Sequence, residues 1–286
     1  MGSLLIAGPL ALDDHPQQAG LLGGVGGYAA IAAAPLAPTQ LWCRAGADIS
    51  NQVKSLLTQR HIDLAGVEWE GTTPRGTASG FVPGGPLLPA LEPTSADRLD
   101  GVLLIGLPPE ETRRALRVVG RLKGSETRPL IVSPRPADLS DTGFRTELLA
   151  VTEVLVLSLA KAQVLTNTDN PLAAAQALQQ DGAKVVVLTA GQLGGVIAYR
   201  QKLTTYPALP VETVDKAGVS AAFPGALAAW IAGSGKCDFS TVKRGCAVAS
   251  AVGGICAQGI GPKKLLSADR GQYLERFNRL RRDQKY

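Results

Sequence analysis

The sequence is poor in the residues that usually build metal and disulfide sites. It has two histidines, and its four cysteines form no CxxC pair and have no neighbouring histidine (Cys43, Cys237, Cys246 and Cys256). This pattern is typical of buried free thiols, so a metal site is not expected. Aromatic residues make up only 5% of the chain, whereas glycine occurs 33 times. We therefore expect a core of closely packed small and aliphatic side chains.

Long apolar runs are also absent. No unbroken stretch of 18 or more apolar residues occurs, so no membrane span is expected. The N-terminal stretch MGSLLIAGPLALDD has no basic residue and soon reaches Asp13 and Asp14, which predicts a first strand rather than a signal peptide. From these features we expect a cytoplasmic protein with no membrane partner.

The net charge of +5 is confined to one end of the chain. Residues 263–286 hold eight Lys/Arg and three Asp/Glu, whereas residues 1–262 hold 21 of each sign. We predict a basic C-terminal helix over 263–286. It is either a solvated face or a surface for an acidic partner or phosphate, and it would bind nucleic acid only weakly.

Apolar strand-like segments alternate with helical ones along most of the chain. SLLIAG, TQLWCRAG, DGVLLIG, RPLIVSP, VTEVLVLS and AKVVVLTAG have the pattern of buried strands, and amphipathic or small-residue helices separate most of them. This order predicts one α/β domain over 1–286 with a mainly parallel sheet covered on both faces. Ligands bind such sheets at the carboxyl ends of the strands, where glycine turns follow.

Several of these segments resemble the ribokinase-like family of PfkB-type carbohydrate kinases, over nearly the whole chain. GPLALD is similar to the family's first strand, which ends at a substrate-binding aspartate, here Asp13. GGVGGYAAIAAAPLA resembles its di-glycine motif, Gly23 and Gly24, which approaches the sugar. The resemblance implies a ribokinase-like three-layer α/β/α fold with a mainly parallel central sheet and lid strands over the substrate.

Two further segments resemble the parts of the family that bind nucleotide. LTAGQLGG resembles the segment whose backbone faces nucleotide phosphate, and VETVDKAGVSAAFPGALAAW resembles the signature DxTGAGDxFxGG. In the family, backbone N–H groups at a helix N-terminus stabilise the transferring phosphoryl group. The phosphate-binding residues that this implies are Thr189, Gly191, Gly194, Gly218, Val219 and Ser220.

The signature departs from the family pattern at the residue that matters most. Ala221 stands where the family has the catalytic aspartate, and a methyl group accepts no proton. Ser220 replaces a glycine of the anion hole, and Val219 adds bulk beside it. Asp215 falls on the first aspartate of the signature, where it is either a substitute base or a cap of the following turn.

The expected metal site and lid are altered too. VLVLSLAKAQVL resembles the segment that carries Asn-x-x-Glu and organises Mg²⁺, but Ser158 and Lys161 occupy those positions. Lys161 can pair with phosphate but cannot template an octahedral metal. The lid segments, about residues 8–20 and 70–93, are short, which predicts a reduced lid that excludes water poorly.

Two functions follow as alternatives. The altered signature favours a catalytically impaired pseudokinase that acts as a scaffold or regulatory subunit, with a protein partner or a homodimer and a small polyol or nucleotide as ligand. The other is an active ATP-dependent sugar or cyclitol kinase, which alone would require ATP and Mg²⁺.

Overall fold

The computed structural model describes residues 2–77, 80–81, 85–90, 93, 99–122 and 128–284. Ten strands of this part form a central sheet in the order β14-β13-β12-β11-β10-β9-β1-β4-β5, and β6 pairs with β4. These strands are β1 (Ser3–Ala7), β4 (Thr39–Ala45), β5 (Ile62–Asp63), β6 (Val67–Trp69), β9 (Leu99–Ile105), β10 (Leu130–Ser133), β11 (Val154–Ser158), β12 (Val185–Thr189), β13 (Gly195–Tyr199) and β14 (Lys202–Tyr206). All pairs are parallel except β12 with β13 and β13 with β14, which confirms the expected mainly parallel sheet.

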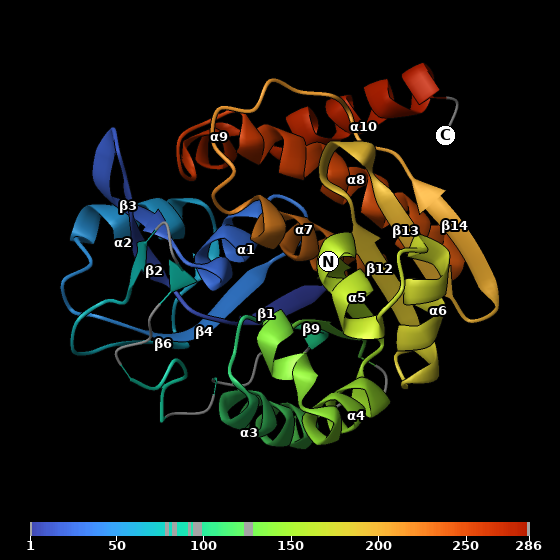
Figure 1. The fold of residues 1–286 in the computed structure, drawn as a ribbon. Coiled ribbons are helices and arrows are strands. Elements are labelled where there is room, and N and C mark those ends of the chain that lie inside the picture. Colours follow the sequence, from blue (N-terminus) through green and yellow to red (C-terminus); the bar gives the residue numbers. More distant parts are fainter. Residues whose placement is uncertain are drawn as a thin grey trace.

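Helices cover both faces of the sheet (Figure 1). They are α1 (Val25–Ala33), α2 (Asn51–Gln59), α3 (Pro109–Arg121), α4 (Thr142–Val151), α5 (Leu159–Thr166), α6 (Pro171–Gln180), α7 (Val219–Ser234), α8 (Phe239–Ala257), α9 (Lys263–Ser267) and α10 (Arg270–Gln284). Successive side chains of a strand point to opposite faces. In β1, Leu4 and Ile6 therefore pack with α1, α7 and α8, whereas Leu5 and Ala7 pack with α3. This division confirms the three-layer α/β/α architecture.

Helices α1 and α7 approach each other closely because their side chains are small. Helix α1 is buried from Gly26 to Ala33, and α7 packs beside it. A Cβ atom added at Gly225 of α7 would lie 2.3 Å from the carbonyl oxygen of Ala29 in α1. Glycine at this position therefore sets the spacing between the two helices, whose N-termini both border the site.

A second, small sheet lies beside the N-terminal part of α1. Its order is β3-β2-β7-β8, with bounds Gln18–Gly23 (β3), Ala11–His15 (β2), Arg75–Thr77 (β7) and Gly80–Phe81 (β8). These strands come from the two segments in which lid strands were expected. Residues 78–79, 82–84 and 91–92 of the predicted lid lie outside the described residues.

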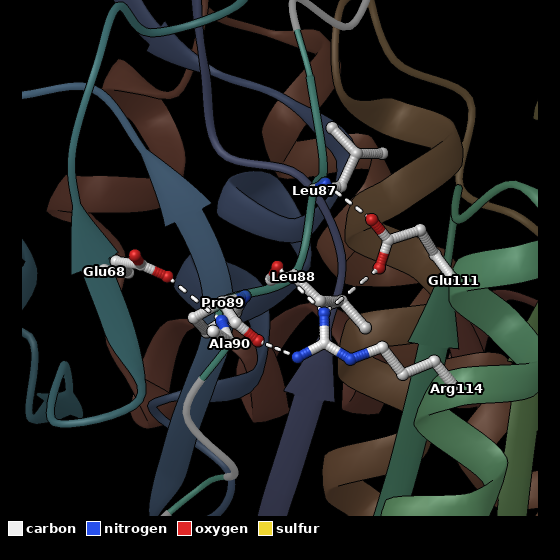
Figure 2. Close-up of polar contacts among 7 residues, drawn as sticks. All are labelled: Glu68, Leu87, Leu88, Pro89, Ala90, Glu111 and Arg114. Atoms are coloured by element: carbon white, nitrogen blue, oxygen red, sulfur yellow. Dashed lines mark hydrogen bonds and ion pairs between the residues drawn. The ribbon is translucent and has the colours of Figure 1, made fainter.

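Residues 85–90, which the sequence assigned to the lid, pack instead against the main sheet. Leu87 and Leu88 are buried with Trp42 and α3. Figure 2 shows the backbone of residues 87–90 held by side chains from both sides, with Glu68 accepting from Ala90 N at 3.2 Å on the side away from α3. Glu111 accepts from Leu87 N at 3.0 Å, and Arg114 donates to the carbonyl of Leu88 at 3.2 Å and to that of Pro89. Burying the apolar side chains of Leu87 and Leu88 in the core is more favourable than leaving them exposed in a solvated lid.

The predicted single basic helix over 263–286 is in fact two helices, α9 and α10. The break has a local cause at Asp269. The Asp269 carboxylate accepts from Gln272 N at 2.8 Å, and the Gln272 side chain accepts from Asp269 N at 3.0 Å. This reciprocal capping box starts a new helix and ends the old one.

Candidate functional site

The structure brings the predicted substrate residues together at the start of α1. Asp13 lies on β2, half-buried, and pairs with Leu21 of β3. A Cβ atom added at Gly23 would lie 2.0 Å from Asp13 Oδ2, so only glycine leaves room for the carboxylate there. Gly24 has a positive φ of 76° at the N-cap of α1 and donates its backbone N–H to Asp13. Asp13, Gly23 and Gly24 form one carboxylate-bearing corner, which we name the Asp13 corner.

The environment of Asp13 makes its carboxylate more basic than usual. Burial raises its pKa, and the hydrogen bond from Gly24 N–H only partly offsets this. The nearby carboxylates of Asp215 and Asp14 raise the pKa further by repulsion. A carboxylate with a raised pKa accepts a hydrogen bond, or a proton, from a ligand hydroxyl more readily.

Tyr28 is a site residue that the sequence analysis missed. A Cβ atom added at Gly218 would lie 2.0 Å from Tyr28 Cδ1, so the ring packs directly on the signature turn. Tyr28 is only 2% exposed, and its hydroxyl has no hydrogen-bond partner in the described structure. Burial raises the pKa of Tyr28, and the carboxylates of Asp13 and Asp215 contribute to this shift. Its position four residues after Gly24 was the available signal.

The signature turn begins with Asp215, whose two oxygens are both engaged. Oδ1 accepts from Ala217 N at 2.8 Å, and Oδ2 accepts from Gly261 N at 2.9 Å. The side chain thus connects the turn before α7 to the loop before α9. This is the capping role that the sequence left open beside a role as base.

Gly218 and Ala221 lie at the start of α7. Gly218 is the N-cap, with a left-handed φ of 74° that favours glycine. Ala221 is fully buried in the first turn, and its N–H donates to the Gly218 carbonyl at 3.0 Å. The position that the resemblance assigns to the general base therefore carries a buried methyl group.

A cavity of about 480 Å³ lies beside this turn, at the carboxyl ends of β11 and β12. Five of the predicted phosphate-binding residues line it: Thr189, Gly191, Gly194, Val219 and Ser220. Ser158 lines it too, whereas Gly218 and Lys161 do not. Its wall also includes Gln192, whose side chain donates to the Val211 carbonyl and to Thr213 Oγ1, both at 3.0 Å. We name this space the α7 cavity.

Lys216, for which the sequence predicted no role, also lines the α7 cavity. It is exposed and lies in the turn between Asp215 and Gly218. The signal was present, because Lys216 is a charged side chain inside the signature motif. Lys161, to which a phosphate role was assigned, is exposed on α5 outside the cavity wall.

The residues at this site do not fit a protein-held magnesium ion. Mg²⁺ sites in nucleotide enzymes usually include one or two carboxylates. Among the residues that the structure describes, no group of three or more His, Cys, Asp or Glu side chains is arranged to hold a metal. The side chains at the expected metal positions are a hydroxyl and an ammonium, Ser158 and Lys161.

A larger hollow of about 720 Å³ lies between the chain after β14 and helices α8 to α10. Four cationic side chains line it, together with Glu212 and Glu275. These cations are Lys264, Arg276, Arg279 and Arg282. The basic C-terminal segment therefore presents part of its charge toward a hollow rather than only to open solvent.

Two further expectations concern cysteines and membranes. All four cysteines are free, and Cys43, Cys246 and Cys256 are buried, as the sequence indicated. Burial raises the pKa of the Cys256 thiol to about 12, which keeps it protonated and unreactive at neutral pH. No helix in the described ranges is both long and apolar enough to cross a membrane.

Comparisons with solved structures show the fold. Aminoimidazole riboside kinase from Salmonella enterica, complexed with aminoimidazole riboside and an ATP analog, superposes with a TM-score of 0.79 at 13% identity, over 96% of this chain and 100% of that chain. Fructokinase from Vibrio cholerae, bound to fructose, ADP and calcium, gives 0.76 at 17% identity, over 97% and 99%. Nucleoside kinase from Burkholderia thailandensis, in complex with inosine, gives a TM-score of 0.74 at 16% identity, over 99% of both chains. The chain therefore has the ribokinase-like fold.

Sequence comparisons show the family. The cytidine kinase of Thermococcus kodakarensis is 31% identical over 127 residues, which are 43% of this chain and 44% of the relative. The match thus spans less than half the length of that relative. The profile of the pfkB family carbohydrate kinases matches residues 87–263. Because this match covers more than half of the sequence, the chain belongs to the pfkB family of carbohydrate kinases.

Proposed function

We propose that the protein is a slow phosphotransferase, which binds a nucleotide in the α7 cavity and a small hydroxyl-bearing acceptor at the Asp13 corner. The observation that carries the proposal is that both sites adjoin the turn that holds Asp215 and Gly218. Tyr28 contacts this turn and interacts electrostatically with Asp13, while Val219 and Ser220 line the cavity. A phosphoryl group bound at the N-terminus of α7 would lie between donor and acceptor.

The acceptor class is a small polyol or a nucleoside. The Asp13 carboxylate and the Gly24 backbone offer hydrogen bonds suited to vicinal hydroxyls. Proteins that share the family or the fold are described as acting on or binding cytidine, aminoimidazole riboside, fructose and inosine. A hydroxyl on a sugar or ribose ring is common to these ligands, and it is the acceptor that we propose here.

The missing base sets the expected rate. Kinases typically turn over at about 1–100 s⁻¹, and a positioned base contributes about 10²–10⁴-fold. Loss of the base at position 221 therefore predicts a kcat of roughly 10⁻⁴ to 1 s⁻¹. We propose that Asp13 receives the hydroxyl proton, because its pKa is raised and both oxygens of Asp215 already accept backbone hydrogen bonds.

A second candidate is a pseudokinase that binds ligands without transferring phosphate. It is favoured by Ala221, which leaves the usual place of the base to a fully buried methyl group. In this role the protein would be a scaffold or regulatory subunit. The cations along the hollow beside α10 would then face an acidic protein partner or a second copy of the chain. For either candidate we propose a cytoplasmic location, where ATP is available.

The experiment is a long-incubation transfer assay with labelled ATP against a panel of polyols and nucleosides. Wild-type protein is compared with Asp13→Asn, which keeps the shape of the side chain but removes its charge. Slow transfer that is lost in Asp13→Asn supports the phosphotransferase and excludes a contaminating kinase, since both proteins are purified alike. If wild type binds ATP but transfers nothing to any acceptor, the pseudokinase holds.

A further inference from the structure

We propose that the α7 cavity binds its nucleotide without a divalent cation held by the protein, and that Lys216 neutralises the phosphate charge instead. The inference rests on the nucleotide binding proposed above and specifies how that site works. It starts from the mismatch between the side chains at the expected magnesium positions and the chemistry that magnesium requires.

The described side chains that line the α7 cavity carry charge of one sign only. Of the described residues that line the cavity, Lys216 alone carries a formal charge, and none is a carboxylate. The remaining polar groups are hydroxyls and one amide, from Ser158, Thr189, Tyr206, Thr213, Ser220, Ser250 and Gln192. Such a wall supplies hydrogen bonds and one positive charge to an anion, but no anionic ligand to a metal.

The carboxylate nearest to Lys216 in the sequence already accepts hydrogen bonds from the backbone. Asp215 precedes Lys216, but its two oxygens accept hydrogen bonds from Ala217 N and Gly261 N. Both oxygens are thus engaged with backbone N–H groups, and Asp215 is not among the described residues that line the cavity. The turn is thus arranged to present the Lys216 ammonium rather than the Asp215 carboxylate.

Lys216 itself is available for a ligand. It is exposed on the cavity wall and makes no ion pair with any residue in the described ranges. A lysine ammonium has three donors and a compact charge, so it can contact two phosphate oxygens at once. The N-terminus of α7, which starts at Val219, adds a partial positive charge on the same wall.

These features predict a preference that differs from that of a magnesium-organised site. Metal-free ATP carries more negative charge than its magnesium complex, so an ammonium attracts it more strongly. We therefore expect the cavity to bind metal-free ATP at least as tightly as magnesium ATP. Adenosine lacks phosphate, so its affinity should not depend on Lys216.

The test measures ATP and adenosine affinity by calorimetry, in EDTA and in excess Mg²⁺. Lys216→Gln is compared with wild type, and Lys161→Gln serves as the matched control because Lys161 is an exposed lysine outside the cavity wall. In EDTA, Lys216→Gln should weaken ATP binding about tenfold or more, as expected for loss of a charged hydrogen-bond donor. It should leave adenosine binding unchanged, and Lys161→Gln should leave both unchanged.

The outcomes separate this inference from the proposed function. ATP binding only in Mg²⁺, or loss of affinity in Lys161→Gln but not in Lys216→Gln, overturns the inference and leaves the phosphotransferase standing. ATP binding in EDTA that depends on Lys216, without any transfer, supports the inference and overturns the phosphotransferase. Absence of ATP binding in both conditions overturns both.

Discussion

The hydroxyl of Tyr28 is costly to the fold unless a ligand uses it. Its hydroxyl is buried without a partner in the described structure, and its ring fills the space against Gly218. A buried polar group without a partner typically costs about 1–3 kcal/mol. We predict that Tyr28→Phe raises the free energy of unfolding by about 1 kcal/mol, measured by urea denaturation of the ligand-free protein. A loss of stability instead would show that the hydroxyl has a partner in solution.

Asp13 should make stability depend on pH in a defined direction. Its pKa is raised in the folded state, mainly by burial, so the fold favours the protonated form. The cost of ionising it is therefore fully present above the raised pKa and disappears below the ordinary value of 3.8. We predict that Asp13→Asn has a higher thermal midpoint than wild type at pH 7, and that the difference closes as the pH falls below 3.8. A difference that is constant over this range would contradict the prediction.

The residues of the site differ in how well the sequence predicted them. Asp13, Gly23 and Gly24 meet as expected, because their motif needs only a strand end and a glycine turn. Lys216 and Tyr28 were missed because their importance depends on where their side chains lie in the folded protein. Both residues lie beside motif glycines, so their positions were visible in the sequence. The sequence does not show that Lys216 lines a cavity, or that Tyr28 packs on a turn about 190 residues later in the chain.

Helix α3 carries a clamp that fixes residues 85–90 to the main sheet. Arg114 donates to two carbonyls of this segment, and its partly buried guanidinium lies 3.9 Å from Glu111 (Figure 2). Charged hydrogen bonds contribute about 1.5–3 kcal/mol. We predict that Arg114→Ala lowers the free energy of unfolding by about 2 kcal/mol, because two carbonyls lose their donor.

The matched control lies one turn further along the same helix. Arg117 is exposed, so Arg117→Ala should change stability by less than about 0.5 kcal/mol. Urea unfolding of both variants checks the prediction. Equal effects of the two substitutions would mean that the clamp contributes nothing beyond a surface arginine.

At the level of elements, the strands were easier to predict than the boundaries of the terminal helices. Buried strands such as β11 and β12 are continuous apolar runs, so composition alone marks them. The division of the basic segment into α9 and α10 was missed although its signal was present, since Asp269 and Gln272 have capping-box spacing. The core position of Leu87 and Leu88 depends on contacts with α3 and β4, which their Gly- and Pro-rich surroundings conceal.

The architecture of the whole molecule explains why the site lies where it does. Strands β11 and β12 end at Ser158 and Thr189, and both residues line the α7 cavity. Alternation of strands and helices was enough to predict the parallel sheet and to point to the strand ends at which the α7 cavity lies. It did not predict the order of the strands, because sheet order is set by packing between segments that are distant in sequence.

The C-terminal helix contributes to the stability of the whole molecule as well as to its charge. Tyr273, Phe277 and Leu280 of α10 are buried. The ring of Phe277 packs at a tilt against Trp230 of α7, with 6.5 Å between the ring centroids. Deleting residues 277–286 removes two of these anchors and leaves a cavity over α7 and α8. Removal of one buried Leu or Phe side chain typically costs about 2–5 kcal/mol, so the truncation should lose about 5 kcal/mol or more.

Deleting only residues 283–286 is the matched control. It keeps Phe277 and Leu280 and removes the exposed Arg279–Asp283 ion pair, which should contribute less than about 0.5 kcal/mol. Because a domain is typically stable by only about 5–15 kcal/mol, the longer truncation should unfold at a much lower urea concentration or fail to fold, whereas the shorter one should match the full chain. Equal unfolding midpoints for the two truncations would mean that α10 serves as an attached basic surface and not as part of the core.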